Sequence, residues 1–307
     1  MDPRFRGEDT CPEVPYAILC SAEHEKNYAG QHAMTRLLCG KYALAVERPL
    51  VMGIVNVTPD SFADGGQHCE PRAAIAQARK LIEDGADLID IGGESSRPGA
   101  KPVSLSEELD RVLPVIEALA RDGVPISIDT QKPEVMRIAI SAGASMVNDI
   151  NALQAPGALQ AIGASKVAVC LMHKQGSPES MQQNPAYADV VAEVQAFLMA
   201  RTDALLAAGV AAERIVIDPG FGFGKTVAHN LRLLRDLDVF LPLGFVLLAG
   251  MSRKSTLGTI TGRAVEERLA ASLAAALLAA QKGAKILRVH DVRETVDVIK
   301  VWQAVGE

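Results

Sequence analysis

The segment RIVIDPGFGFGKT, residues 214–226, joins a short apolar run to a glycine-rich loop and decides how the chain folds. Its glycines and the pair Lys225-Thr226 suggest a phosphate-binding P-loop, G-x-x-x-x-G-K-[ST]. The first glycine of that pattern falls on Pro219, which has a fixed φ and no N–H to offer a phosphate. The segment is therefore better explained as a buried strand that ends at Asp218 and leads into an irregular loop.

The same design recurs along the chain. Seven other apolar runs are continuous rather than alternating, as expected for strands that are buried on both faces of a parallel sheet. Longer helical segments separate the runs, and several end at a glycine, a common helix stop. Eight strand–helix units in 307 residues predict an α/β fold, a single (β/α)8 TIM barrel. The predicted strands are 49–56, 87–93, 125–129, 145–149, 166–172, 214–218, 245–250 and 285–290.

The competing architecture is a doubly wound open sheet, but the first strand–helix turn lacks the G-x-G-x-x-G pattern. We expect residues 37–47 to form an N-terminal hairpin that closes the bottom of the barrel. Residues 1–33 show no clear period, and we expect them to be an appendage, disordered or non-native. The barrel domain then occupies residues 34–307.

Composition limits the partners and the compartment. A net charge of −6 argues against broad nucleic-acid binding, which needs a basic face. The five cysteines form no CxxC pair, and their odd number is typical of a reducing cytoplasm rather than of a disulfide framework or a zinc site. No apolar run reaches the roughly 20 residues that a membrane span needs, and no secretory signal is visible. We expect a cytoplasmic protein with no membrane or nucleic-acid partner.

Polar side chains follow every predicted strand. The active site of a TIM barrel lies at the C-terminal ends of its strands, so these residues are the candidates for function. A single Asp in such a position is often a helix cap, and a lone His is often structural. Eight polar ends that converge on one mouth are harder to explain as caps alone. They include Asn56, Arg97, Asp129, Asn148, His173, Asp218, Lys254, Arg288 and His290.

These candidates divide into two kinds of chemistry. Asp129, Asn148 and Asp218 offer acceptor and amide groups that suit the donor-rich edge of a planar heterocycle, since a carboxylate accepts paired N–H bonds strongly. Lys254 can bond to a ring carbonyl or nitrogen nearby. The second group suits a diphosphate with its Mg²⁺ ion, which prefers oxygen ligands. It consists of Asn56, Arg97, Arg253, Arg288 and His290.

Five motifs make this pattern specific: NVTPDSFADGG (56–66), GGESSRPGA (92–100), DPGFGFGK (218–225), MSRKS (251–255) and RVHD (288–291). Together they resemble dihydropteroate synthase of the folate pathway, over a region from about Leu37 to the C-terminus. The resemblance implies a homodimeric TIM-barrel transferase that joins 6-hydroxymethyl-7,8-dihydropterin diphosphate to 4-aminobenzoate. The products would be 7,8-dihydropteroate and diphosphate, formed by an SN1-like displacement.

The resemblance also implies a role for each matching residue. The pterin would contact Asp129, Asn148, Met172, Asp218, Phe223 and Lys254. The diphosphate would contact Asn56, Ser96, Arg97, Arg288 and His290, with Asn56 as a ligand of Mg²⁺. The aminobenzoate, with which sulfonamides would compete, would contact Phe62, Pro98, Arg253 and Ser255. The catalytic residues would be Asn56, Asp64, Lys254, Arg288 and His290, and Asp64 would stabilise the cation or accept the amine proton.

Two alternatives are weighed against this interpretation. A corrinoid-dependent pterin methyltransferase-type barrel shares the Asp–Asn–Asp pterin pattern but needs no group to hold a diphosphate. A non-catalytic pterin-binding paralogue is possible in principle, because a fold does not guarantee an activity. The motifs at 56–62, 251–255 and 288–291 favour the synthase over both.

Overall fold

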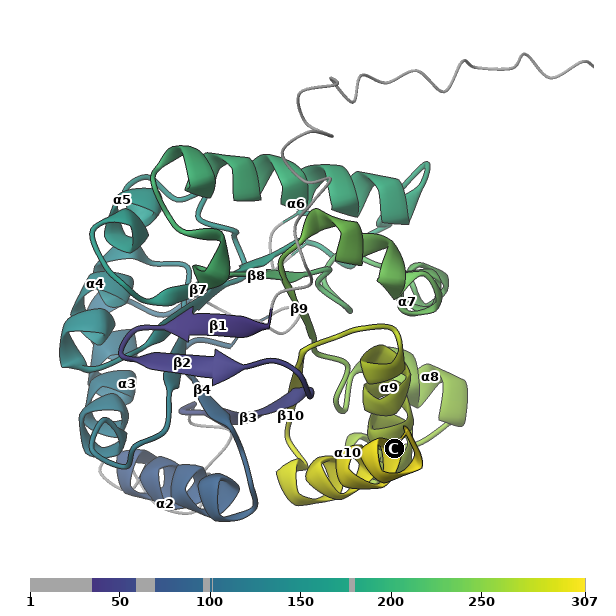
Figure 1. Cartoon of the computed structure of the whole chain (residues 1–307), viewed down its shortest axis with the longest axis horizontal. Helices are drawn as coiled ribbons and strands as arrows, with labels where there is room; N and C mark the ends of the chain where they lie inside the picture. The colour runs from purple at the N-terminus through teal and green to yellow at the C-terminus, as the bar shows by residue number, and fades with distance from the viewer. Residues whose placement is uncertain (1–34, 59–69, 96–99, 101, 177–179, 307) are drawn as a thin grey trace, which may run out of the picture. The chain divides into compact units, whose positions relative to one another are not determined.

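A computed structural model describes residues 35–58, 70–95, 100, 102–176 and 180–306. The prediction about residues 1–33 lies outside this part of the chain, as do those that concern Phe62, Asp64, Ser96, Arg97 and Pro98. Within it, eight parallel strands close into a barrel in the order β10-β3-β4-β5-β6-β7-β8-β9 (Figure 1). The predicted TIM barrel is therefore confirmed.

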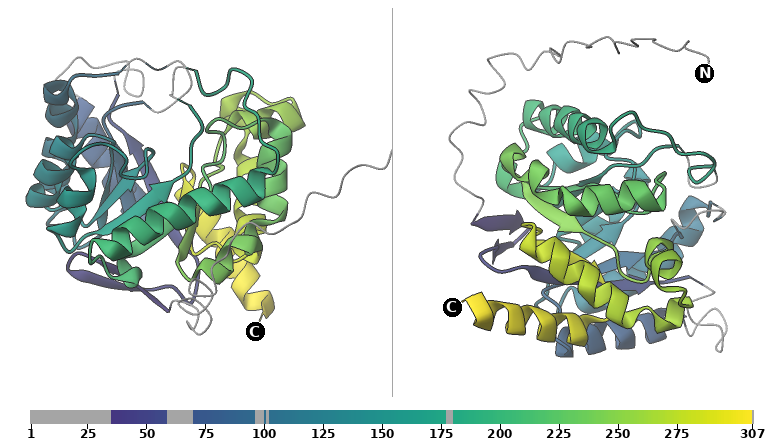
Figure 2. Two further views of the ribbon diagram at one scale, coloured as in Figure 1. Left: turned by 90° about the horizontal axis from the view of Figure 1, so that it is seen from above. Right: turned by 90° about the vertical axis from the view of Figure 1, so that its right-hand side faces the viewer.

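Each barrel strand lies within one of the predicted apolar runs. The strands are β3 (Leu50–Asn56), β4 (Leu88–Gly92), β5 (Ile126–Asp129), β6 (Met146–Asp149), β7 (Ala168–Met172), β8 (Ile215–Asp218), β9 (Val246–Ala249) and β10 (Ile286–Val289). Every residue of β4, β7, β8 and β9 is buried, which is why these strands are apolar apart from Asp90 and Asp218. Helices cover the outside of the barrel (Figure 2).

Helices connect the strands. They are α2 (Glu70–Glu83), α3 (Leu105–Leu119), α4 (Pro133–Ala142), α5 (Ala158–Gly163), α6 (Val190–Ala207), α7 (Val227–Arg235), α8 (Ser255–Thr261), α9 (Leu269–Gln281) and α10 (Val292–Gly306). Short 3₁₀ helices are η2 (Ala212–Arg214), η3 (Leu237–Leu243) and η4 (Val265–Glu267). Side chains of Ser104, Asp189 and Thr226 cap the first backbone N–H groups of α3, α6 and α7. In the described part of the chain, no helix combines the length and the apolar character that crossing a bilayer requires.

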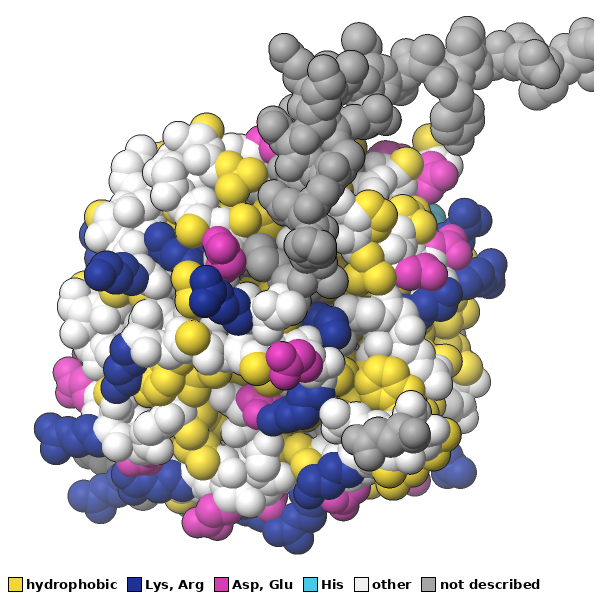
Figure 3. Space-filling model, viewed as in Figure 1, with side chains coloured by type: hydrophobic (Ala, Val, Ile, Leu, Met, Phe, Trp, Pro, Cys, Tyr) yellow, Lys and Arg dark blue, Asp and Glu magenta, His cyan; other side chains and the backbone are white. Residues whose placement is uncertain are grey.

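The predicted hairpin is confirmed at the N-terminal end of the barrel. Strands β1 (Arg36–Cys39) and β2 (Tyr42–Ala45) pair antiparallel, and Gly40 takes a φ of +62° in the two-residue turn. Leu37 and Cys39 are fully buried against Leu50, Met146 and other first residues of the barrel strands. Figure 1 looks onto this end, with the hairpin in front, and Figure 3 shows acidic and basic side chains interspersed over the same face.

Candidate functional site

The predicted heterocycle ligands lie in one layer at the C-terminal end of the barrel. Asp129 ends β5 and pairs in register with Asn148 of β6, while Asp218 ends β8 beside Met172 of β7. Asn148 pairs with Cys170, two residues before Met172. Because residues two apart in a strand share a face, these side chains lie on the same face of the sheet. Gly92 completes the layer in β4 without a side chain, and a Cβ there would lie 3.7 Å from both Asn56 Oδ1 and Asp129 Cβ.

A buried ion network joins the two predicted kinds of chemistry. Arg288 donates from Nη2 to Asp129 Oδ2 at 2.8 Å and from Nε to Asp90 Oδ2 at 2.6 Å. Burial disfavours the charged Arg288, but Asp90 and Asp129 together outweigh it and hold its pKa above the usual value. Burial raises the pKa of Asp129, and Arg288 opposes that change. Arg288 therefore stays a cation within the acceptor layer.

Lys254 follows β9, the strand that pairs with β10, which carries Arg288. Its ammonium donates to the backbone oxygen of Phe221 and sits 4.6 Å from the ring centroid of Phe223. Burial lowers the pKa of Lys254 to about 8, although Asp218 acts in the opposite sense. Burial likewise raises the pKa of Asp218, whose Oδ1 accepts from Gly220 N at 2.7 Å. Lys254 thus interacts with both the Asp218 carboxylate and the Phe223 ring.

The loop after β8 is held rigidly, and this explains the apparent P-loop. The buried Lys225 ammonium lies 2.9 Å from Gly220 O, 3.1 Å from Phe223 O and 2.9 Å from His173 Nδ1. Burial lowers the pKa of Lys225 to about 7, and burial together with Lys225 lowers the pKa of His173 to about 3. A Cβ on Gly220 would lie 1.8 Å from His173 O, so this glycine permits a close approach of two loops. Lys225 therefore binds protein carbonyls rather than a phosphate.

His290 and Ser252 meet at the ends of β10 and β9. Ser252 Oγ accepts from His290 N at 3.2 Å and lies 3.0 Å from His290 Nδ1. When the hydroxyl donates its proton to Nδ1, the neutral imidazole carries its own proton on Nε2. This arrangement gives His290 a second N–H donor directed away from Ser252, which suits an anion.

The segment after β9 carries two residues that were predicted to contact the aminobenzoate. Arg253 has a φ of +58°, and its guanidinium binds both oxygens of Asp291. Ser255 is exposed at the first residue of α8, next to Lys254. The predicted contacts of Arg253 and Ser255 with an aminobenzoate remain predictions, but in this structure the charge of Arg253 is neutralised by Asp291.

Two residues of the site were not among the predicted ligands. Asp90 is fully buried and reaches both Arg288 and Asn148, and Ser252 orients His290. A signal for Asp90 was present, since it is the only charged residue within the apolar strand LIDIG. The sequence contains no comparable signal for Ser252, because a serine at a strand end is common in loops.

Comparisons with known proteins agree with this geometry. Residues 52–290 match the family model of pterin binding enzymes. A dihydropteroate synthase of Haemophilus influenzae is 50% identical over 270 residues, which cover 88% of this chain and 98% of that protein.

Two solved structures of Xanthomonas albilineans dihydropteroate synthase are also similar. The complex with 4-aminobenzoic acid is 55% identical with a TM-score of 0.85, and it covers 89% of this chain and 98% of that one. The complex with 7,8-dihydropteroate is 50% identical with a TM-score of 0.80 and the same coverage. Fold, strand-end residues and overall identity therefore agree, and the chain belongs to the dihydropteroate synthases of the pterin-binding enzyme family.

Proposed function

We propose that the chain condenses 6-hydroxymethyl-7,8-dihydropterin diphosphate with 4-aminobenzoate to form 7,8-dihydropteroate and diphosphate. The single observation that carries this proposal is the layer formed by Asp129, Asn148 and Asp218, flanked by the cations Lys254 and Arg288. The related synthases bound to 4-aminobenzoic acid and to 7,8-dihydropteroate support the same substrate and product.

The acceptor layer suits the pterin ring. Its amino-pyrimidine edge carries several N–H donors, which the carboxylates of Asp129 and Asp218 would accept in short, charge-assisted bonds. Lys254 would donate to the ring carbonyl or a ring nitrogen. Phe223 lies beside Lys254, and the buried Met172 stands next to Asp218 in register, so these two would contact the faces of the ring. The pocket thus combines directional polar contacts with apolar walls.

The cationic side of the site suits the diphosphate. Arg288 and the Nε2 proton of His290 would donate to its oxygens, where negative charge builds up as the leaving group departs. Ser96 and Arg97, which lie outside the described residues, would also contact the diphosphate.

Mg²⁺ fits the residues that are present. Asn56 Oδ1 faces the space above Gly92, and the described residues contain no cluster of three His, Cys, Asp or Glu that would form an all-protein cage. Mg²⁺ typically keeps several waters and takes one or two protein oxygens together with substrate phosphates. We propose that Asn56 would be its protein ligand, and the bound ion would neutralise charge on the diphosphate.

The reaction then follows from charge and position. The C–O bond between the pterin methylene and the diphosphate breaks, and the dihydropterin ring donates electron density to the cation that forms. The amine nitrogen of aminobenzoate forms the new C–N bond and loses one proton. An aniline is a modest nucleophile, so holding it beside the cation contributes more than a strong base would. Ser255, Phe62 and Pro98 would position the aminobenzoate, and Asp64 would take up the proton or stabilise the cation.

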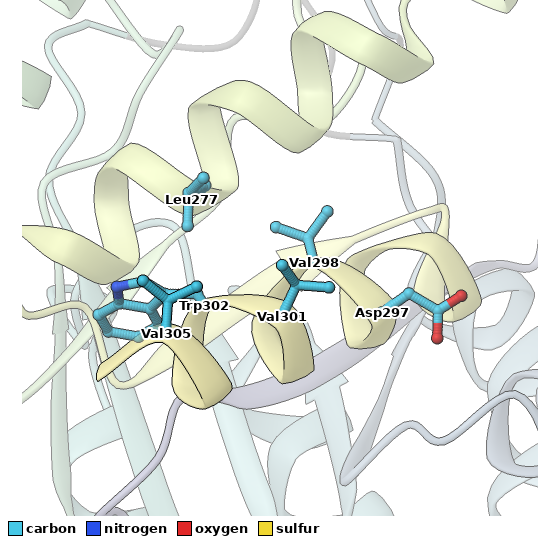
Figure 4. Close-up of a pocket in the computed structure, with 6 residues that line it drawn as sticks. All are labelled: Leu277, Asp297, Val298, Val301, Trp302 and Val305. Atoms are coloured by element: carbon cyan, nitrogen blue, oxygen red, sulfur yellow. The ribbon is translucent and has the colours of Figure 1, made fainter. Parts of the chain in front are cut away.

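We also propose that the protein is a homodimer. A groove of about 460 Å³ lies between α9 and α10 and is lined almost entirely by apolar side chains (Figure 4). Val301 and Val305 are 66% and 82% exposed, and Leu278 of α9 is 50% exposed. Apolar surface of this kind on two adjacent helices favours a partner with the same surface. In sedimentation velocity, the wild type should be a dimer and Val301→Glu a monomer; a monomeric wild type would refute this.

The cytoplasm remains the proposed compartment. Among the described residues, Cys39 and Cys170 are both free and buried. Burial raises the pKa of Cys39 to about 12, so its thiol stays protonated and unreactive. Free thiols are typical of reducing compartments.

One experiment separates the proposed function from its alternatives. Diphosphate release from the pterin diphosphate is followed with and without 4-aminobenzoate. The proposal predicts release only with aminobenzoate, with one dihydropteroate formed per diphosphate, and competition by sulfonamides. Release without aminobenzoate would indicate a hydrolase, and no release would indicate a methyltransferase-type or non-catalytic protein.

A further inference from the structure

Asp90 lies directly beneath the acceptor layer. It is the third residue of β4, and it is 0% exposed. Leu88, two residues earlier, belongs to the apolar core at the bottom of the barrel, and Gly92, two residues later, lies in the acceptor layer. Residues two apart in a strand share a face, so Asp90 points into the barrel between core and mouth. A carboxylate at this depth is costly unless donors satisfy it.

One oxygen of Asp90 holds two groups of the site. Oδ2 accepts from Arg288 Nε at 2.6 Å and from Asn148 Nδ2 at 3.2 Å. Arg288 extends the chain of hydrogen bonds to Asp129. Asp90 therefore connects side chains from β5, β6 and β10 without belonging to the layer that would meet the ring.

The contact with Asp90 determines which end of the Asn148 amide faces the site. The amide has one donor end and one acceptor end, and Nδ2 is committed to Asp90. The reverse orientation would place Asn148 Oδ1 against a carboxylate oxygen, and two acceptors repel. Within the described residues, Asn148 Oδ1 is buried and has no hydrogen-bond partner. Leaving such a buried atom unsatisfied costs stability, so this oxygen favours a ligand that brings an N–H.

We propose that Asp90 is a positioning residue that sets the ligand preference of the pocket, because it fixes the Asn148 amide with its oxygen toward the ring. The proposal rests on the proposed function, in which the ligand is an amino-pyrimidine ring. With Asn148 held in this way, Asp129, Asn148 and Asp218 all present acceptors. The pocket then prefers a ring with a 2-amino group over the same ring with a 2-oxo group, which replaces two N–H donors by an acceptor.

Loss of Asp90 should weaken this preference. Without the carboxylate, the Asn148 amide can rotate and offer Nδ2 to a carbonyl. The preference is measured as the affinity for the 2-amino ring divided by the affinity for the 2-oxo ring. We expect Asp90→Ala to lower this ratio by about tenfold, because the 2-amino ring loses one hydrogen bond and the 2-oxo ring gains one. Asp90→Asn keeps an oxygen that can accept from Arg288 and Asn148 in the same position. Its affinity ratio should remain within about threefold of the wild-type ratio.

The test is isothermal titration of 6-hydroxymethylpterin and its 2-oxo analogue into the wild type, Asp90→Ala and Asp90→Asn. Should Asp90→Ala fail to fold, Asp90→Leu, of similar size and without an acceptor, takes its place. A reduced ratio that Asp90→Asn restores supports the proposal. Equal losses for both rings, or an unchanged ratio, would overturn it and indicate a purely structural carboxylate. A wild type that binds neither ring would instead contradict the proposed function itself.

Discussion

The two ends of the barrel are built from the same eight strands but contain different kinds of residue. At the N-terminal end, Leu37 and Cys39 of the hairpin pack on the first residues of the strands, and this cluster is entirely hydrophobic. At the C-terminal end, Asp90, Asp218 and Lys225 are buried, and Arg288 is nearly so. Apolar burial stabilises the fold, whereas buried charges cost stability unless a ligand or partner satisfies them.

Residues that stabilise the fold and residues that would carry out the chemistry therefore lie at opposite ends of the barrel. Substitutions at the hairpin end should alter the free energy of unfolding and leave turnover intact. Substitutions at the C-terminal end should reduce turnover and leave the free energy of unfolding largely unchanged.

The largest effect is expected for Lys254→Met. The variant loses the ammonium that contacts the Phe223 ring and would donate to the pterin, so kcat/KM should fall by about 1,000-fold. Its free energy of unfolding should not decrease, because a desolvated charge is removed. Steady-state kinetics and urea unfolding measure the two quantities, with the surface variant Lys282→Met as the control. A variant that fails to fold would assign Lys254 a structural role.

Next in size is Leu37→Ala at the opposite end. Leu37 is 0% exposed, and truncating such a side chain should lower the free energy of unfolding by about 3 kcal/mol. Below the unfolding transition, kcat/KM should match the wild type. The exposed Leu231→Ala is the matched control and should lose far less stability. A large drop in kcat/KM of the folded Leu37→Ala would show that the two ends are coupled.

A smaller effect is expected for Ser252→Ala. Without the hydroxyl, His290 Nδ1 loses its contact with Ser252, and this contact no longer favours one tautomer of the imidazole. We expect kcat/KM for the pterin diphosphate to fall about tenfold, with little change in stability. Ser141→Ala, at an exposed helical serine, provides the comparison. Unchanged kinetics would mean that Ser252 does not orient His290.

The smallest effect concerns Lys225 and pH. Burial lowers the pKa of Lys225 in the folded protein to about 7, below the ordinary lysine value of 10.5. Between these values the unfolded chain binds more protons, so the wild type gains stability as pH rises, by at most about 1.4 kcal/mol per pH unit. Lys225→Met lacks this group. The unfolding free energy of the wild type minus that of the variant should therefore increase by about 1 kcal/mol from pH 7.5 to 8.5. Urea unfolding at the two pH values measures this difference. A flat difference would mean an ordinary lysine pKa.

The sequence alone predicted the barrel, the hairpin and the position of each strand end, because continuous apolar runs and the polar residues after them are local signals. It could not predict which side chains pair. Arg253 binds Asp291, and Lys225 binds the backbone oxygen of His173, and both contacts join segments distant in sequence. The reason for the glycine at position 220 could not be predicted either. A side chain there would clash with the backbone of His173, which lies close only in the folded chain.

The most direct test of the separation is calorimetric binding of a pterin ring without its diphosphate to three proteins. These are the wild type, Leu37→Ala and Asp218→Asn, which keeps the shape of the aspartate but removes its charge. The account predicts equal affinity for the wild type and folded Leu37→Ala, and a loss of at least about 100-fold in Asp218→Asn with unfolding free energy unchanged. Equal binding by Asp218→Asn, or weakened binding by Leu37→Ala, would contradict it.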